Sequence, residues 1–356
     1  GLVLREGGAE VHLTGCNPLS TQDDVAAAVA DSGVDTYGVY GVNMEEYENL
    51  LVETLKCRPH LVVDDGGDLI NLLGGKCAQY GDRLIGGCEE TTTGIHRLYA
   101  REREGILPCP MMAVNDAKAK HYYDNKYGTG QSTWDAIMHT TNLIVAGKTV
   151  VVAGYGWCGK GIAMRAKGMG ANVIVCEVDP FKALDATMEN FRVMSMDEAA
   201  KIGDIFVTAT GCKDVIVKRH FDVMKNNAVL CNSGHFDCEV DVAALRSMAA
   251  ETFPRRQNIE GFRLADGRVL NVLAEGRLVN LAGGNGHPAE IMDMSFAVQA
   301  LSLEWLAKHR EGLEKKVYIV PDEIDDQIAR VKLAAMGLSI DTLTDEQRAY
   351  LSGWEA

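Results

Sequence analysis

Hydrophobic positions in the first third of the chain alternate between short β-branched runs and stretches with helical spacing. Apolar residues that recur at three- and four-residue intervals predict helices, and compact apolar runs bounded by turn residues predict buried strands. We therefore expect strands over residues 9–13, 36–39 and 60–63, and helices over residues 21–31 and 45–55. This alternation is typical of a parallel sheet covered by helices.

The same alternation returns further along the chain. A polar segment over residues 115–130 leads into a predicted helix that runs through 134–144, and a second α/β unit follows over 148–281. The spacing then predicts a long amphipathic helix over 290–309 and a last helix over 325–336.

The pattern predicts an α/β protein with two doubly wound, Rossmann-like parallel-sheet domains and a short helical C-terminal tail. We expect the first domain to comprise residues 1–125, completed by 289–322. The second domain is expected over 126–288 and the tail over 323–356.

Composition narrows the classes of partner and site. The net charge of −15 disfavours binding to nucleic acid or to an anionic membrane surface. No apolar run is long enough to span a bilayer. The 10 cysteines include no C-x-x-C pair, so neither a zinc site nor a dithiol redox site is predicted, and we expect no metal. Cys176 and Cys231 lie in apolar strand-like runs, as expected of free thiols in a reducing cytoplasm.

A glycine-rich turn follows the apolar run over 148–153. It reads Gly154-Tyr155-Gly156-Trp157-Cys158-Gly159, which matches G-x-G-x-x-G, and a helical pattern over 160–169 comes next. In a dinucleotide-binding loop the first glycine allows the tight turn and the second lets the backbone approach a pyrophosphate. The third lets helix and strand pack closely, and the helix N-terminus offers free N–H groups to the phosphates.

A second strand over 172–176 ends at Glu177, 18 positions after Gly159. An acid near this spacing accepts hydrogen bonds from a ribose 2′-hydroxyl and repels a 2′-phosphate, which favours NAD over NADP. Lys182 lies close enough to weaken that preference. A glycine-rich turn in an unrelated α/β protein is the plainer interpretation, and the complete strand–turn–helix–strand–acid order argues against it.

Further clusters of polar residues lie outside this unit. They are Asp64-Asp65-Gly66-Gly67-Asp68, Glu89-Glu90-Thr91-Thr92-Thr93-Gly94, Asn115-Asp116 with Lys120 and Asp124-Asn125, the loop around His235, and the loop around His287. Taken singly, the acidic loops are typical of capped strand-to-helix turns, and Lys120 with Asp124 is typical of a surface i, i+4 ion pair. A lone loop histidine is more often structural than catalytic.

In this order the motifs resemble those of the S-adenosyl-L-homocysteine hydrolase family. The likeness covers nearly the whole chain, from Ser20-Thr21-Gln22-Asp23 through Asp64–Asp68, Glu89–Gly94 and Gly234-His235-Phe236-Asp237 to Ala274–Leu281. The shortened tail and the run Ala289-Glu290-Ile291-Met292-Asp293 resemble archaeal or thermophilic-bacterial members. The resemblance implies that NAD oxidises the substrate ribose at C3′, that the C4′ proton is then removed, and that homocysteine leaves C5′. Water adds there before the ketone is reduced again.

The resemblance also implies roles for individual residues. Lys120 handles the 3′-hydroxyl proton with Asp124 beside it, Asp65 is the base near C4′, and His235 serves the C5′ and sulfur side. A lysine acts as a base only if its pKa falls, which we expect a desolvated site to bring about. Residues expected to bind substrate are Ser20, Glu90, Asn115, His287 and Met292. Residues expected to bind NAD are Thr91, Thr92, Thr93, Asn125, Gly154, Gly156, Trp157, Cys158, Gly159, Glu177, Lys182, Ser233, Gly234, His235 and Asn280.

The chain departs from the family pattern at several points. It lacks the N-terminal His-x-Thr-x-Glu segment that reads the purine, so we expect it to be truncated at the N-terminus. It also lacks the Lys- and Tyr-bearing tail that other members insert into a neighbour's NAD site, so we expect NAD to be held less tightly. Thr129 stands where many members have cysteine near the nicotinamide, and Lys182 replaces a usual asparagine. The resemblance implies a homotetramer, with the helix over 325–336 as an assembly element.

Three other interpretations stay open. The substrate could be S-inosyl-L-homocysteine, since the purine-reading segment is absent. The chain could be a catalytically silent NAD-binding homologue, which the presence of Lys120, Asp65, Asp124 and His235 argues against. A 2-hydroxy acid dehydrogenase would share the dinucleotide unit but would not explain the motif at 89–94.

Overall fold

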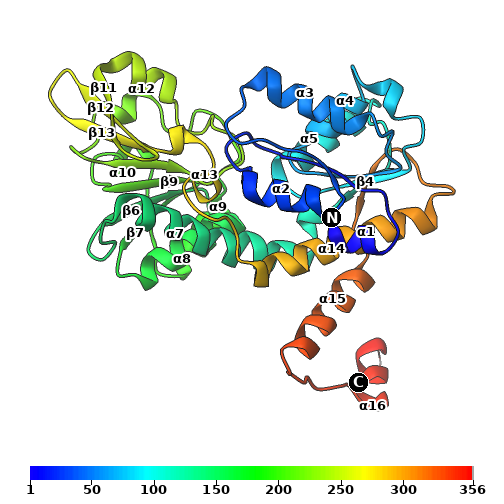
Figure 1. The fold of residues 1–356 in the computed structure, drawn as a ribbon. Coiled ribbons are helices and arrows are strands. Elements are labelled where there is room, and N and C mark those ends of the chain that lie inside the picture. The colour runs from blue at the N-terminus through cyan, green and yellow to red at the C-terminus, as the bar shows by residue number, and fades with distance from the viewer. Residues whose placement is uncertain (355–356) are drawn as a thin grey trace.

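Two helix-covered sheets form the two lobes of the molecule, as the computed structural model of the chain shows (Figure 1). The structure describes residues 1–354. The chain enters the first lobe, crosses to the second, and returns to the first before its tail projects away from both (Figure 1).

The first lobe contains a parallel four-stranded sheet of order β14-β5-β4-β3. Its strands are β3 (Leu61–Asp64), β4 (Gly86–Glu89), β5 (Met111–Ala113) and β14 (Val317–Ile319). β14 pairs with β5, so the returning chain supplies an edge strand to a sheet that began far earlier in the sequence. Two further strands, β1 (His12–Thr14) and β2 (Asp35–Tyr37), form a separate parallel pair.

Helices and short helical turns surround this sheet and continue into the tail. They are α1 (Leu2–Glu6), α2 (Asp23–Asp31), α3 (Met44–Leu55), α4 (Asp68–Leu73), η1 (Ala78–Tyr80), α5 (Thr92–Arg103), η2 (Val114–Asp116), α14 (Ala289–His309), α15 (Asp322–Ala335) and α16 (Asp345–Ser352).

The second lobe contains an eight-stranded sheet of order β11-β12-β13-β10-β9-β6-β7-β8. Its strands are β6 (Thr149–Ala153), β7 (Asn172–Cys176), β8 (Arg192–Val193), β9 (Ile205–Thr208), β10 (Val229–Asn232), β11 (Ala249–Arg256), β12 (Ile259–Leu264) and β13 (Val269–Leu273). From β8 to β13 the pairs are all parallel and follow the 3-2-1-4-5-6 order of the Rossmann fold. β11 and β12 add an antiparallel edge that the hydrophobic pattern did not predict.

The helices of this lobe begin at the crossing between the two sheets. They are α6 (Lys118–Lys120), the π-helix η3 (His121–Gly128), α7 (Thr129–Thr141), α8 (Trp157–Gly168), α9 (Pro180–Met188), α10 (Met196–Ala199), α11 (Lys218–Phe221), α12 (Val242–Met248), η4 (Ala274–Gly276) and α13 (Val279–Ala282).

Each face of the eight-stranded sheet has its own hydrophobic core. Val150 and Val152 of β6 point to one face, where Trp134 of α7 and Ile162 of α8 cover them. Val151 points to the other face and packs in a cluster with Phe206. A run of β-branched residues buried on both faces is what a central parallel strand requires, which explains the continuous apolar pattern of this segment.

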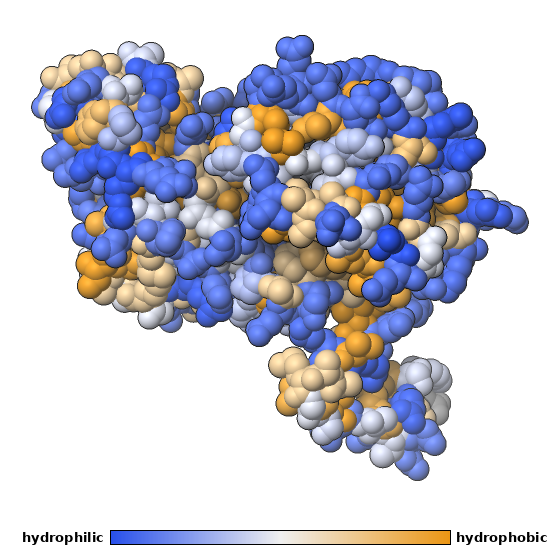
Figure 2. Space-filling model, viewed as in Figure 1, coloured by the Kyte–Doolittle hydropathy of each residue, from blue (hydrophilic) through white to orange (hydrophobic). Residues whose placement is uncertain are grey.

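The structure confirms the predicted fold class, with two parallel-sheet units and a helical tail. Two predicted elements have the wrong bounds. The strand expected over 9–13 begins only at His12 and ends at Thr14. The helix expected through 144 ends at Thr141, because Asn142 adopts a left-handed conformation (φ 54°) that closes its last turn. The tail leaves apolar side chains exposed, and Figure 2 shows them where it projects below the body. These residues include Val331, Met336, Leu338 and Ile340.

Candidate active site

A buried lysine is the centre of the polar cluster at the crossing between the lobes. Lys120, at the end of α6, is only 5% exposed. Its Nζ donates to Asn125 Oδ1 at 2.6 Å and to Asn115 Oδ1 at 3.2 Å. The carboxylates of Glu90 and Asp124 lie 3.7 Å and 3.8 Å from it. The alternative of a surface ion pair is therefore wrong, since both Lys120 and Asp124 are buried.

The π-helix η3 explains how one lysine meets two consecutive polar residues. In an α-helix the side-chain neighbours of a residue lie three and four positions away, whereas π-helical bonds reach five positions. The wider turn lets Asp124 and Asn125 both face Lys120. Asn125 Nδ2 also donates to Asn115 Oδ1 at 3.0 Å, so the amide groups hold each other in place.

Asp124 connects this cluster to the loop around His287 and to the long helix α14. Its Oδ1 accepts from His287 Nδ1 at 2.5 Å, and its Oδ2 accepts from Ser295 Oγ at 2.6 Å. Burial alone would raise the pKa of Asp124, but Lys120 and His287 outweigh it and hold that pKa well below its usual range. Asp124 is therefore ionised. His287, expected to contact the purine, lies against this carboxylate.

The protonation of Lys120 differs from the expectation. Burial lowers the pKa of its ammonium, but the carboxylates of Glu90 and Asp124 more than offset burial and raise that pKa above its usual value. The expected fall of the Lys120 pKa is thus wrong for the arrangement seen here. The sequence led us to expect that Lys120 is desolvated. It did not indicate that the Glu90 carboxylate lies close to it.

For the pKa of Glu90, burial has a larger effect than the neighbouring charge of Lys120. Burial raises its pKa to about 8, although Lys120 counteracts the shift. Gln299 of α14 donates to Glu90 Oε2 at 2.5 Å, while Glu90 Oε1 is buried without a hydrogen-bond partner. An unpaired buried acceptor is costly, so Oε1 is well suited to receive a hydroxyl from a ligand.

Glu90→Gln tests this titration through stability. Because the folded pKa lies above the usual value of 4.5, the contribution of Glu90 to stability is full below that value and is lost as the pH rises toward about 8. As the pH rises from about 5 to about 8, we expect the melting temperature of the variant to increase relative to that of the parent. Thermal unfolding across this range measures it, with exposed Glu311→Gln as the control. If the difference in melting temperature between variant and parent did not change with pH, the raised pKa of Glu90 would be contradicted.

Asp65 and His235 face each other across the two lobes. Asp65 follows β3 and His235 follows β10, and Asp65 Oδ1 lies 4.0 Å from His235 Nδ1. Gly66, beside Asp65, has φ +103°, and a Cβ built on it would come within 2.5 Å of His235 Nε2. The two predicted catalytic residues thus approach only because this position is glycine.

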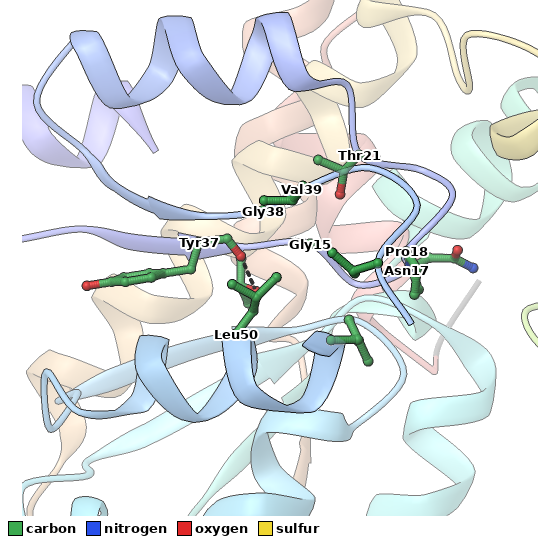
Figure 3. Close-up of a pocket in the computed structure, with 11 residues that line it drawn as sticks. Gly15, Asn17, Pro18, Thr21, Tyr37, Gly38, Val39 and Leu50 are labelled. Carbon is green, nitrogen blue, oxygen red and sulfur yellow. Dashed lines mark hydrogen bonds between the residues drawn. The ribbon is translucent and has the colours of Figure 1, made fainter. Parts of the chain in front are cut away.

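The loop after β1 brings Ser20 and Cys16 to the same side of the first lobe. Ser20 Oγ donates to Asn17 O at 3.0 Å. Burial and the adjacent Asp65 raise the pKa of the Cys16 thiol. Figure 3 shows a hollow at the base of this loop, between Gly15, Thr21 and Leu50. Its volume of about 10 Å³ has room for about one water molecule.

The glycines of the predicted dinucleotide loop have the expected surroundings. Gly154 has φ +93°, and a Cβ on Gly159 would lie 1.9 Å from Gly154 O, so α8 meets β6 too closely for any side chain. No atom lies within 4 Å of a Cβ built on Gly156, which leaves the space above its backbone open. Gly156 also caps α8 without a side-chain hydrogen bond, so the first N–H groups of the helix are free for a phosphate.

Glu177 ends β7 beside this loop. Its Oε2 accepts from Tyr155 N at 2.7 Å, and its Oε1 accepts from Val178 N at 2.6 Å. The carboxylate therefore holds the glycine-rich turn as well as being in the place expected of a ribose-binding acid. Lys182, in the first turn of α9, has its Nζ 3.9 Å from Asp179.

Asn280 provides a second unpaired acceptor. Its Nδ2 donates to Ser132 Oγ and to His287 Nε2, each at 3.1 Å, while its buried Oδ1 has no hydrogen-bond partner. An amide oxygen of this kind is suited to receive the N–H of a carboxamide. Together with the open space over Gly156, it fits a dinucleotide that ends in a nicotinamide.

The other predicted cofactor and substrate residues line the same crossing. Ser233 Oγ bonds Thr133 Oγ1 at 2.7 Å, and Gly234 N donates to Asn232 Oδ1 at 2.7 Å. Thr91 precedes α5 as its N-cap residue. The remaining contacts are Thr92 Oγ1 with Asn115 Nδ2, Cys158 Sγ with Thr129 Oγ1, and Trp157 stacked on His121. Thr93 and Met292 are half-buried, and no polar contact places them.

Sequence reasoning missed Ser295, Gln299 and Cys16. Ser295 and Gln299 stand four positions apart on α14, which places them on one helix face. That polar pair inside a mostly apolar helix was the available signal. The hydrogen bonds to Asp124 and Glu90 show that α14 supplies part of the site.

The fold and these contacts define a dinucleotide-dependent enzyme with a buried acid–base cluster. Comparison with protein families gives the same result in two segments. Residues 2–81 match the family described as S-adenosyl-L-homocysteine hydrolase, and residues 125–286 match the NAD-binding domain of S-adenosyl-L-homocysteine hydrolase.

Curated relatives extend the likeness to almost the whole chain. Adenosylhomocysteinase of Thermococcus kodakarensis is 54% identical over 99% of this chain and 84% of its own length. Adenosylhomocysteinase of Aquifex aeolicus is 55% identical over the same shares. S-inosyl-L-homocysteine hydrolase of Methanocaldococcus jannaschii is 56% identical over 99% of this chain and 84% of its own length. The chain belongs to the S-adenosyl-L-homocysteine hydrolase family.

Family membership confirms the predicted hydrolase class and NAD as the cofactor. Among the described residues 1–354, no helix is long and apolar enough to cross a membrane.

Proposed function

We propose that the chain catalyses the reversible, NAD-dependent hydrolysis of S-adenosyl-L-homocysteine to adenosine and L-homocysteine. The observation that carries the proposal is the buried Lys120, held by Asn115 and Asn125 between two carboxylates. A 2-hydroxy acid dehydrogenase would not explain the motif at 89–94, which supplies Glu90 to this cluster.

We assign the two ligands to different parts of the chain. Residues 1–125 with 289–322 would hold most of the substrate, and residues 126–288 would hold most of NAD, with residues 91–93 and 125 reaching it from the first domain. Bound NAD would supply reversible oxidation and reduction at the ribose 3′-carbon. It would be held by the glycine loop at 154–159, Glu177, Asn280, the threonines at 91–93 and Ser233, with Asn125, Trp157, Cys158, Lys182 and Gly234 beside them.

Lys120 would accept the 3′-hydroxyl proton, and Glu90 Oε1 would receive a ribose hydroxyl. Because the pKa of Lys120 is raised, Lys120 must first give up its own proton. Glu90 lies 3.7 Å away with a pKa of about 8, so it is mostly protonated at neutral pH and can take that proton only once it has ionised at higher pH. Above about pH 8 the two groups would share one proton, which can pass from Lys120 to Glu90.

Asp65 and His235 would act on the opposite side of the ribose. Once C3′ is a ketone, the C4′ proton is acidic and Asp65 accepts it. His235 gives a proton to the departing sulfur and then takes one from the water that adds at C5′, while Asp65 returns its proton to C4′. His287 would contribute to the purine side while it orients Asp124.

Thiol release from purified protein tests the proposal. S-adenosyl-L-homocysteine and S-inosyl-L-homocysteine are each supplied without added NAD, and free thiol is followed. We expect release from the adenosyl compound. Release from the inosyl compound alone would favour the alternative that the equally similar methanogen relatives raise. No release from either, with NAD bound, would favour a silent homologue.

We also propose a homotetramer assembled in part through the tail. The support is the exposed apolar surface of the tail, including Met336 (61% exposed) and Ile340 (59%). Light scattering on the purified chain measures the mass, and a monomer would contradict the proposal.

A further inference from the structure

Arg97 reaches from the first lobe to the second. It lies on α5, and its Nη1 donates to Gly66 O at 2.8 Å and to Asp68 Oδ1 at 3.2 Å. The same guanidinium lies 4.5 Å from the ring centroid of Phe236, the residue directly after His235. One side chain thus contacts the loop that carries Asp65 and the loop that carries His235.

The peptide groups of Gly66 are held from both sides. Its N–H is bonded to Glu89 Oε1 at 2.9 Å, and its carbonyl accepts from Arg97. Glu89 Oε1 also accepts from Thr91 N at 2.9 Å, which ties this loop to the one that carries Glu90. Because Asp65 directly precedes Gly66, these bonds fix the backbone that directs the Asp65 carboxylate.

Phe236 connects Arg97 to His235. The rings of His235 and Phe236 lie edge to face with centroids 4.8 Å apart. A cation over an aromatic face contributes about 0.5–1 kcal/mol at exposed sites, and half of the Arg97 side chain is covered. Lysine would keep the charge but lose the planar fork that bonds Gly66 and stacks on the ring together.

We propose that Arg97 is a positioning residue that couples the Asp65 loop to the His235 loop. The proposal rests on the proposed function, because it assigns to Arg97 the alignment of the C4′ base with the acid at C5′. Arg97 contacts none of the polar partners of Lys120. Its effect therefore falls on elimination and water addition and spares oxidation at C3′.

Arg97→Ala separates these steps. We expect adenosine to reduce the bound NAD within about twofold of the parent rate, while thiol release slows by about 10- to 100-fold, the cost of a small misplacement. Phe236→Leu should have the same effect, and Arg97→Lys should recover only part of the loss. Arg101→Ala is the matched control, because Arg101 lies one turn further along α5 and bonds Asn71 within its own lobe.

The double variant Arg97→Ala/Phe236→Leu tests the coupling. We expect it to lose no more than either single variant, as for residues that act as one unit. If the fold-loss of the double variant were the product of the two single losses, the proposal would be overturned. An equal loss of NAD reduction and thiol release would also overturn it.

Amide hydrogen exchange provides a readout that needs no turnover. Arg97→Ala should speed exchange in both 64–68 and 232–237, and faster exchange in 64–68 alone would overturn the coupling. If the parent protein releases no thiol, the proposed function fails, and the exchange result still decides whether Arg97 links the loops.

Discussion

Lys120→Ala is expected to abolish the reduction of bound NAD by adenosine and to lower thiol release by about 10³-fold, within the range usual for a lost acid–base group. The reason is geometric, since Lys120 is the cation that both buried carboxylates face. The absorbance of reduced nicotinamide, followed after adenosine is added to protein with bound NAD, measures the first step directly.

Lys120→Arg distinguishes a lost base from a lost charge. It keeps a cation near Glu90 and Asp124, but a guanidinium stays protonated in proteins and cannot accept the hydroxyl proton. We expect this variant to be folded, to bind NAD and to be as inactive as the alanine variant. Normal NAD reduction in either variant would remove Lys120 from its proposed role.

Gly161→Ala is expected to destabilise the protein by about 3 kcal/mol, the upper part of the range for overpacking a core. A Cβ at Gly161 would lie 1.8 Å from the carbonyl oxygen of Lys126, and backbone cannot move aside as a flexible side chain does. A Cβ built on Gly130 of α7 would likewise lie 2.7 Å from backbone atoms of Gly161. Helix α8 therefore touches the segment that carries Asp124 and Asn125 without any side chain between them.

Gly168→Ala is the matched control on the same helix. A Cβ there meets no atom within 4 Å, and alanine favours helix by about 0.5–1 kcal/mol. Urea unfolding of both variants compares the free energies. We expect Gly161→Ala also to weaken NAD binding, since α8 begins at the glycine loop. Equal stability of the two variants would show that α8 and η3 can separate at no cost.

The dinucleotide unit was predictable because its determinants are local. The strand before Gly154, the helix after Gly159 and the acid at Glu177 are adjacent in sequence, and each glycine role follows from backbone geometry. The structure agrees in strand order and in the close packing at Gly159.

The state of Lys120 was not predictable from spacing. Its pKa depends on Glu90, which is brought near by the pairing of β4 with β5. Ser295 and Gln299 approach from α14, more than 170 residues away from Asp124 along the chain in the first case. Such contacts form when the returning chain, with α14, packs against the first lobe. No periodic pattern in the sequence indicates this packing.

The π-helix has a consequence for which changes of chain length the fold tolerates. Removing one residue from 121–128 would restore ordinary α-helical bonding and rotate α7 by about 100° relative to α6. Lys120 would then lose either Asp124 or Asn125, and Gly130 would no longer face Gly161. An insertion in the exposed turn between β11 and β12 would disturb none of these contacts. Homologous chains should therefore keep a fixed number of residues between Lys120 and Gly130, while the β11–β12 turn should vary in length where it keeps Asn258, which bonds Ala282 O.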